Sequence, residues 1–400
     1  MRERHNASGT VCRTAALTAL TLAAAMLFSG CALLTDILSH LTETLPPDRT
    51  VSPGPQATPA ATAPAAPFDF VPDIPEYTLP PEEFPDDLER EASEIIDPAI
   101  ARALAYVSVM KDSRHSYTVH PFEEDANGYI AKLNSADREL FRRFVEAGKR
   151  GEALTVGEQE YDALAKEYAG KREHELVDAY FAIYEPLQYC EPGLSSYYGT
   201  NGESYISGDY NSSHMRNVFG FFYDPYRFMD SSVASGAVTM EDVLHGAELL
   251  DRVVKRVVRF MPEGLTAYDR YYYLAAVLSE KVMYDDRPAN CFSAFGALVC
   301  GKAVCEGYTA EYYLLCREAG LWCAYRDGLP EGAGHTWNMV KLDSGIYNVD
   351  VTWCDGKGNP YERPWYRCFM RSDAVFEADG HCALYGVAGV GESELSPYEK

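Results

Sequence analysis

The chain has 400 residues, 47% of them hydrophobic and 24% charged, a balance that excludes a disordered or a collagen-like protein. Its 60 acidic and 35 basic residues give a formal net charge of −25, which argues against a basic phosphate-binding surface, so we expect no nucleic-acid partner. The 11 cysteines are an odd number without the paired Cys-x-x-Cys spacing of a structural zinc site. At least one thiol therefore stays unpaired within the chain or has another use.

The amino terminus has the layout of a secretory signal peptide over residues 1–30. Basic residues precede the uncharged apolar run Thr14–Gly30, and the small pair Ser29 and Gly30 lies directly before Cys31. This ending resembles the lipobox of bacterial lipoproteins, which implies cleavage before Cys31 and lipidation of its thiol. An uncleaved membrane anchor is the alternative, because the uncharged run continues beyond Cys31 to about spanning length. On either interpretation the rest of the chain lies at the extracytoplasmic face of the cell membrane.

Residues 31–92 are expected to form an acidic, extended linker. Between Pro46 and Pro85 lie 12 of the chain's 23 prolines, mixed with Ala and Thr, a composition that favours polyproline II and cannot bury a core. The stretch from Ala32 to Ala92 holds 12 acidic residues and two arginines, so it carries −10 of the net charge of −25. Like charges keep such a linker extended.

A mainly helical region is predicted over residues 93–264. Periodic apolar residues indicate helices at Ser135–Gly148 and Thr155–Glu185. Thr155 and Glu158 have the spacing of a capping box, in which the hydroxyl and the carboxylate each satisfy a free N–H group at a helix start. We therefore expect the second of these helices to begin at Thr155.

The clearest helix of this region is predicted over Thr239–Met261. Its apolar residues recur at steps of three and four and form a core-facing side, made of Val243, Ala247, Leu250, Val254, Val257 and Met261. The opposite side carries the charged residues Glu248, Arg252, Lys255, Arg256 and Arg259. A basic side can bind a polyanion, but the acidic residues beside it favour a solvated surface.

The first candidate functional residue is a cysteine at the start of a later helix. Thr266 and Asp269 mark one helix start, and a further helix is predicted from Cys305 to a left-handed C-cap at Gly320. The positive end of a helix dipole favours the thiolate form of a first-turn cysteine, and the thiolate is the nucleophile. The backbone N–H of Cys305 is also placed to bind an oxyanion. A lone cysteine at a helix start, however, is more often a small buried hydrophobic residue.

The next two segments, residues 332–342 and 346–353, are predicted to form a β-hairpin with a turn at Asp343-Ser344-Gly345. Opposite residues of an antiparallel pair have a constant sum of positions, and a turn with an even number of residues makes that sum odd. His335 and Asp350 then project from the same face as diagonal neighbours, with Cβ atoms roughly 7–8 Å apart or less. An imidazole and a carboxylate can meet across that distance.

A thiolate nucleophile, an imidazole base and a carboxylate that fixes the imidazole tautomer are the groups that acyl transfer through a thioester requires. Taken singly, His335 is better explained as a surface histidine and Asp350 as a turn residue. Their combination with Cys305 instead indicates a catalytic triad. In this triad Cys305 is the nucleophile, His335 the base and Asp350 the group that orients His335.

The three residues lie in the motifs Gly-Lys-Ala-Val-Cys-Glu-Gly-Tyr (301–308), Gly-His-Thr-Trp-Asn (334–338) and Tyr-Asn-Val-Asp-Val-Thr-Trp (347–353), which a segment from Cys368 to His381 follows. In this order the motifs resemble the transglutaminase-like superfamily of papain-type thiol enzymes. The resemblance implies an α+β fold, with a papain-like core over residues 265–400 that packs the helix of Cys305 on an antiparallel sheet. It also implies that Cys305 attacks a carboxamide or peptide carbonyl. Members include cross-linking transferases, proteases and deglycosylating amidases, so the resemblance does not choose the acceptor.

Several features of the site stay open at this point. The second oxyanion donor has three candidates, Asn290, Trp337 and Asn338. Cys300 and Cys354 lie close to the motifs and are either partners in a regulatory disulfide or inert buried thiols. The chain has no acidic loop with the pattern of a calcium site, and we expect neither a metal nor a cofactor.

The leading hypothesis is a membrane-anchored, extracytoplasmic thiol enzyme. It would form an acyl-thioester on Cys305 from peptide or Gln-type amide carbonyls, and then hydrolyse it or transfer the acyl group to an amine. Its partners would be a peptide or protein substrate at the cell envelope and the membrane, through the lipid on Cys31. The alternatives are a non-catalytic envelope module that binds with the same fold, and a maturation protease for a neighbouring surface protein. The sequence leaves the oligomeric state open.

Overall fold

The structure is a computed structural model that describes part of the chain. The described residues are 75–110, 117–150, 154–156, 158–168, 179, 182–183, 186–187, 189–191, 219–221, 240–288, 290–328, 334–354, 368–378, 380–381 and 383–385. The predicted signal peptide at residues 1–30, the lipidation site Cys31 and most of the predicted linker lie outside these residues.

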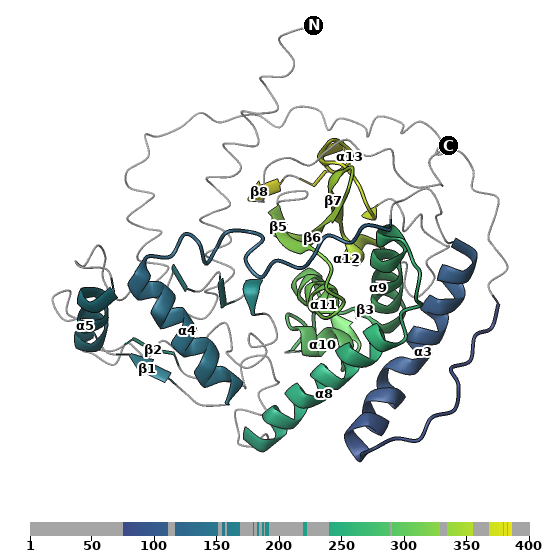
Figure 1. The fold of residues 1–400 in the computed structure, drawn as a ribbon, viewed down its shortest axis with the longest axis horizontal. Helices are drawn as coiled ribbons and strands as arrows, with labels where there is room; N and C mark the ends of the chain where they lie inside the picture. The colour runs from purple at the N-terminus through teal and green to yellow at the C-terminus, as the bar shows by residue number, and fades with distance from the viewer. Residues whose placement is uncertain are drawn as a thin grey trace, which may run out of the picture. The chain divides into compact units, whose positions relative to one another are not determined.

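The described chain contains both helices and strands (Figure 1). The helices are α3 (Asp87–Met110), α4 (Ser135–Lys149), α5 (Glu158–Tyr168), α8 (Met240–Arg259), α9 (Ala267–Lys281), α10 (Ala294–Leu298), α11 (Cys305–Glu318), α12 (Val351–Cys354) and α13 (Asp373–Ala378). The strands are β1 (Leu154–Val156), β2 (Phe219–Phe221), β3 (Met283–Tyr284), β4 (Lys302–Ala303), β5 (Cys323–Gly328), β6 (His335–Leu342), β7 (Gly345–Val349) and β8 (Ala383–Tyr385). The described fold thus mixes helices and sheet after a helical N-terminal region, which confirms the predicted α+β class at this level.

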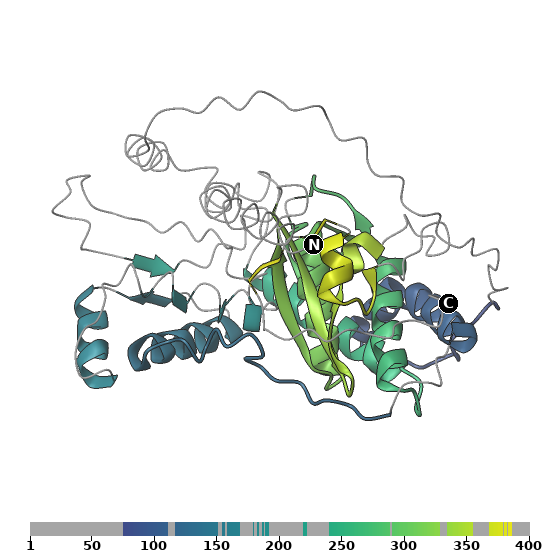
Figure 2. The same cartoon turned by 90° about the horizontal axis from the view of Figure 1, so that it is seen from above.

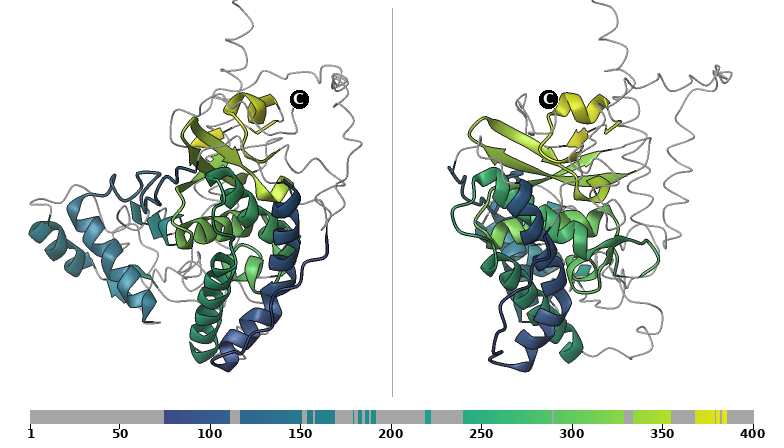
Figure 3. Two further views of the ribbon diagram at one scale, coloured as in Figure 1. Left: turned by 45° about the vertical axis from the view of Figure 1, so that its right-hand side comes forward. Right: turned by 90° about the vertical axis from the view of Figure 1, so that its right-hand side faces the viewer.

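The main sheet has four antiparallel strands in the order β7-β6-β5-β8. In Figure 2 its longer strands appear as twisted green ribbons that lie side by side. Helix α11 packs on one face of the sheet, and α13 lies on the other face (right-hand view of Figure 3). The sheet is therefore a central layer, and side chains from both of its faces are buried.

The predicted hairpin is confirmed in its register but not in its length. Met339 pairs with Asn348, so opposite positions have an odd sum, and the turn has two residues between Leu342 and Gly345. The second strand, however, ends at Val349, and α12 occupies part of the predicted strand 346–353. The reason is a change of partner: the N–H of Asp350 donates to the carbonyl of Cys368 at 2.8 Å instead of continuing the ladder with β6.

The largest hydrophobic core joins α3, α8, α9 and α11 with the strands β5, β6 and β7. Helix α9 lies between α11 and α3, and it contributes the buried run from Tyr271 to Leu278 (Figure 1). Side chains of α3, such as Ile96 and Ile100, belong to the same core as Tyr308 of α11. The division into domains at residues 93–264 and 265–400 stays a prediction.

The predicted helix starts and ends are partly confirmed. Thr266 caps α9, since its hydroxyl oxygen accepts the N–H of Asp269 at 3.1 Å, and Gly320 has the left-handed φ of 68° that ends α11. The capping box at Thr155 is wrong, because Thr155 pairs with Gly220 in a short sheet and α5 begins only at Glu158.

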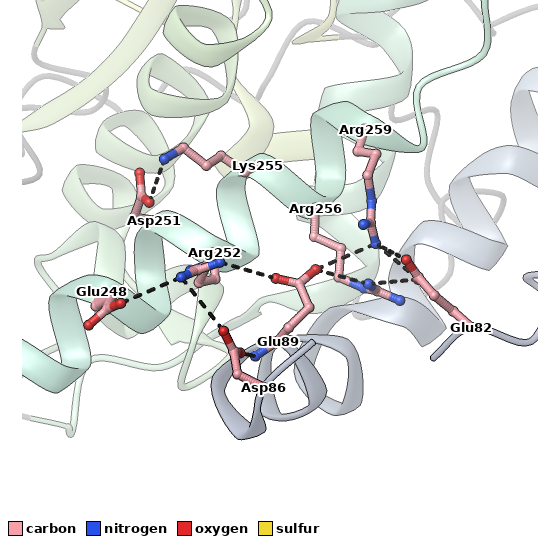
Figure 4. Close-up of polar contacts among 9 residues, drawn as sticks. All are labelled: Glu82, Asp86, Glu89, Glu248, Asp251, Arg252, Lys255, Arg256 and Arg259. Atoms are coloured by element: carbon pink, nitrogen blue, oxygen red, sulfur yellow. Dashed lines mark hydrogen bonds and ion pairs between the residues drawn. The ribbon is translucent and has the colours of Figure 1, made fainter. Parts of the chain in front are cut away.

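The charged side of α8 is largely exposed, as the sequence predicted, since the side chains of Glu248, Lys255 and Arg259 are 60%, 55% and 47% exposed, but Arg256 is an exception. Arg256 is 2% exposed, because α3 and the residues before it cover the guanidinium with carboxylates (Figure 4). The guanidinium of Arg256 binds both oxygens of Asp97 at 2.5 and 2.8 Å and lies 3.1 Å from Glu82 and 3.3 Å from Glu89. Residues 82–97 and α8 are thus joined by an ion-pair network. Among the described helices, none combines the length and the apolar character that crossing a membrane requires.

Candidate active site

Cys305 is the first residue of α11 and follows β4 directly. Val304 is the N-cap residue in extended conformation, and its side chain makes no capping hydrogen bond, so no side chain of the cap occupies the N–H groups of the first turn. The N–H of Val304 donates to the carbonyl of Cys291 at 2.9 Å, which fixes the entry of the chain into the helix. The positive end of α11 therefore meets the Cys305 thiol, as the sequence predicted.

Gly307 allows α11 to approach the preceding segment closely. A Cβ atom at this position would lie 2.6 Å from the carbonyl oxygen of Cys291 and 2.8 Å from the Cβ of Ala303. Real Cβ atoms do not come so close to backbone oxygens, so any side chain here would displace the start of the helix. This glycine therefore fixes where Cys305 lies, and it explains its place two residues after the cysteine in the motif.

His335 and Asp350 form the second part of the site. His335 opens β6, and its Nε2 lies 2.7 Å from Oδ2 of Asp350, which directly follows β7. A carboxylate can only accept a hydrogen bond, so Nε2 of His335 carries the proton. The other ring nitrogen, Nδ1, is then left for the thiol. The side chains of His335 and Asp350 are 8% and 0% exposed.

The Cys305 thiol is close enough to His335 to contribute to the raised pKa of its imidazole. Burial alone would lower the pKa of His335, but the charge and hydrogen bond of Asp350, followed by those of Cys305, raise it to about 10. Burial would likewise raise the pKa of Asp350, yet the His335 and His381 imidazoles hold it well below its usual range. An imidazolium of His335 beside the carboxylate of Asp350 is thus the favoured state at neutral pH.

Thr309 joins the helix of the nucleophile to the strand of the base. Its hydroxyl lies 2.8 Å from the carbonyl oxygen of Cys305 and 3.0 Å from that of Thr336, the residue after His335. In the opposite direction, the side-chain amide of Asn338 donates to the carbonyl of Thr309 at 3.1 Å. These contacts across the interface of α11 and β6 hold Cys305 in register with His335, and sequence patterns did not point to them.

All three candidates for the second oxyanion donor make hydrogen bonds elsewhere. The indole N–H of Trp337 donates to Oδ1 of Asn348 at 2.9 Å, and the amide of Asn338 serves Thr309 and the sulfur of Cys323. The amide of Asn290 donates to the sulfur of Cys300 at 3.1 Å. The backbone N–H of Cys305 is therefore the oxyanion donor that the geometry supports best.

Aromatic rings surround the imidazoles of the site. The ring of Trp353 lies 5.7 Å from that of His335 and 4.2 Å from that of His381, and Trp337 lies 5.8 and 5.1 Å from the same two rings. Cys305 and His335 remain partly accessible, whereas Asp350 and His381 are buried. Solvent thus reaches Cys305 and His335 but not the carboxylate of Asp350.

A metal is not needed to explain this cluster. His335, Asp350 and His381 offer ligand atoms that all lie within 4.8 Å of one another, which makes them the candidate metal-binding group among the described residues. Both Nε2 atoms, however, lie within hydrogen-bond distance of the same carboxylate oxygen, at 2.7 and 3.1 Å. Direct hydrogen bonds account for the arrangement.

Six of the described cysteines are free thiols, namely Cys190, Cys291, Cys300, Cys305, Cys316 and Cys323. Cys300 is exposed and Cys354 is buried, so neither the disulfide nor a pair of buried thiols describes them both. Cys12, Cys31 and Cys382 lie outside the described residues. A cavity of about 580 Å³ lies along α4, but none of the triad residues lines it.

Comparison with known proteins yields little. No family model and no curated protein matches the chain. One solved structure, described as a crystal structure of a TGase, aligns with 34% of this chain and 40% of its own chain at 18% identity and a TM-score of 0.24. The chain thus spans about two-fifths of the length of that structure. This likeness is too weak to support an argument, so the functional conclusion depends on the residues themselves.

Proposed function

We propose that the protein is a thiol enzyme that forms an acyl-thioester on Cys305 from a peptide or Gln-type amide, and then hydrolyses the thioester or transfers the acyl group to an amine. The observation that carries the proposal is the 2.7 Å contact between His335 and Asp350, together with a thiol at the start of α11 that contributes to the raised pKa of His335. A module that only binds a ligand has no need of all three groups together.

The reaction follows from the protonation state of the pair. The Cys305 thiolate attacks the amide carbon, and the carbonyl oxygen becomes an oxyanion near the N–H of Cys305. His335 gives its proton to the leaving nitrogen, the C–N bond breaks and the thioester remains. A water or an amine then loses a proton to His335 and attacks the thioester, and the C–S bond breaks. Asp350 keeps the imidazole in the tautomer that both steps use.

The location of the enzyme is part of the same proposal. The basic start, the apolar run and the Ser29-Gly30-Cys31 ending support a signal peptide and a lipid on Cys31, which would hold the enzyme at the extracytoplasmic face of the cell membrane. Peptides and proteins of the cell envelope would then be its substrates. Expression with an alkyne fatty acid should label the wild-type chain and leave Cys31→Ala unlabelled; equal labelling of the two would refute lipidation at Cys31.

The test of the activity is to trap the thioester. The full chain is incubated with a glutamine-containing peptide and a labelled amine, and adducts are mapped by mass spectrometry. Wild type should carry the acyl group on Cys305, Cys305→Ala should carry none, and the matched variant Cys300→Ser, which removes an exposed thiol outside the triad, should behave as wild type. Amine incorporation would indicate a transferase and shortened peptides a protease. Absence of an adduct, with Cys305 reacting with iodoacetamide no faster than Cys300, would leave a binding module as the better conclusion.

A further inference from the structure

His381 contacts the same carboxylate oxygen as the base of the triad. Its Nε2 lies 3.1 Å from Oδ2 of Asp350, and Nε2 of His335 lies 2.7 Å from this oxygen. The second carboxylate oxygen, Oδ1, accepts the backbone N–H of Trp353 at 3.1 Å. Asp350 is therefore held by three donors, two of which are imidazoles.

The chemistry of the contact assigns the proton on His381. A carboxylate accepts but does not donate, so Nε2 of His381 carries a proton. The opposite ring nitrogen, Nδ1, is buried and has no hydrogen-bond partner among the described residues. A ring that served only to fill this aromatic site would be better without a buried, unpaired nitrogen, because an unsatisfied polar atom is unfavourable there. The bond to Asp350 gives a reason for a histidine at this position.

The turn at the end of α13 places His381 beside the carboxylate of Asp350. Gly380 has a left-handed φ of 95°. Its N–H donates to the carbonyl of Glu377 at 3.2 Å, and the N–H of His381 donates to the carbonyl of Phe376 at 2.8 Å. This pair of bonds is a Schellman motif, which turns the chain back on the helix and places the residue after the glycine against the last turn. The rings of His381 and Phe376 accordingly lie 4.2 Å apart. The orientation of His381 is thus built into the helix end.

We propose that His381 is a positioning residue that fixes the carboxylate of Asp350 with Oδ2 toward His335. The inference extends the proposed function, because it concerns how the same triad is oriented. With the His381 donor on Oδ2 and the Trp353 N–H on Oδ1, the carboxylate has one rotamer that satisfies both bonds. Without the His381 donor, Asp350 keeps a single orienting bond besides His335, and the imidazole loses its fixed orientation relative to the Cys305 thiol.

The test uses two variants of the full chain. His381→Gln keeps an N–H donor near the position of Nε2, whereas His381→Phe keeps an aromatic ring and loses the donor. The first readout is the rate at which iodoacetamide alkylates Cys305, measured by peptide mass spectrometry relative to Cys300 in the same molecule. Removal of orienting partners behind functional histidines costs roughly 10- to 100-fold in metal enzymes. We expect a loss of at least about tenfold in His381→Phe and a rate near that of wild type in His381→Gln.

The second readout judges the contact without relying on the reactivity of Cys305. Nitrogen-15 histidine spectra of the wild type should place the His381 proton on Nε2 and show a strongly deshielded Nε2 proton on His335, which His381→Phe should weaken. A proton on Nδ1 of His381, equal slowing of both variants, full reactivity of a folded His381→Phe, or a stoichiometric metal in the purified protein would overturn the proposal. If Cys305 is unreactive in wild type while the spectra show both bonds, the proposed function fails and the His381 contact stands.

Discussion

The ion pairs of Arg256 offer a sharp test of how α3 is held on α8. Arg256 is 2% exposed and binds Asp97 with two nitrogens. Glu82 and Glu89 lie within 3.3 Å of its guanidinium (Figure 4). The perturbation is Arg256→Gln, which keeps a polar side chain and removes the charge. Three carboxylates then face one another without the guanidinium that lies among them.

The size of the effect follows from burial. Removal of one partner from a buried ion pair costs about 3–5 kcal/mol, because the other charge stays desolvated. Glu82 and Asp97 are 30% and 28% exposed, and Arg259 still contacts Glu82 at 2.9 Å, so part of the charge remains compensated. We therefore expect Arg256→Gln to lower the free energy of unfolding by about 3 kcal/mol, the lower end of that range.

The neighbouring residue supplies a matched control. Lys255 pairs with Asp251 at 2.7 Å on the same helix, but the two side chains are 55% and 52% exposed. An exposed pair at this spacing contributes about 0.3–0.5 kcal/mol, and salt screens it. Urea unfolding followed by circular dichroism should thus separate Arg256→Gln from Lys255→Gln severalfold, with equal denaturant slopes. Equal losses for the two variants, or a loss for Arg256→Gln that vanishes in high salt, would refute the burial argument.

Three further predictions concern the helix of the nucleophile and the base. Thr309→Val should lower the free energy of unfolding by about 1–3 kcal/mol and slow alkylation of Cys305, since a buried carbonyl loses its donor; Thr309→Ser should retain most of both, and an unchanged alkylation rate in Thr309→Val would contradict the positioning role. Burial raises the pKa of Glu311 well above its usual range, so the folded protein keeps a proton that the unfolded chain loses above pH 4.5, and stability should fall as pH rises. In urea unfolding, Glu311→Gln should make the free energy of unfolding depend less on pH, and parallel curves for the two proteins would contradict a protonated Glu311. The raised pKa of His335 contributes stability that is present below pH 6.5 and lost as pH rises toward about 10. The difference in unfolding free energy between wild type and His335→Ala should therefore shrink over that pH window, and a constant difference would contradict the ion pair with Asp350.

The features that the sequence predicted correctly are those that depend on neighbours along the chain. The register of β6 and β7 follows from a two-residue turn, because side chains alternate strictly along a strand and a shift by one residue would reverse both faces. The cap at Thr266 and the left-handed Gly320 likewise depend on four to six consecutive residues. His335 and Asp350 could be paired for the same reason.

The errors arise where a distant segment decides the structure. Val349, Val351 and Thr352 favour a strand by composition, yet the partner of Asp350 is the carbonyl of Cys368, and the Asp350 carboxylate caps the short helix that follows. Arg256 has the helical position of a solvated residue, but acidic residues of the predicted linker and of α3 cover it. Part of the acidity that the sequence attributed to an extended linker is therefore used inside the fold.

A distant segment also contributes to the candidate site, where it helps to compensate the buried charge of Asp350. A carboxylate with no exposed surface is unfavourable unless opposite charge and hydrogen bonds compensate it. Asp350 has the imidazole of His335, the N–H at the start of α12 and the imidazole of His381, and the last of these comes from a segment 31 residues away. Local patterns placed the first of these contacts and could not place the last. Cys305 and His335 stay partly exposed, whereas Asp350 and its distant partner His381 are buried.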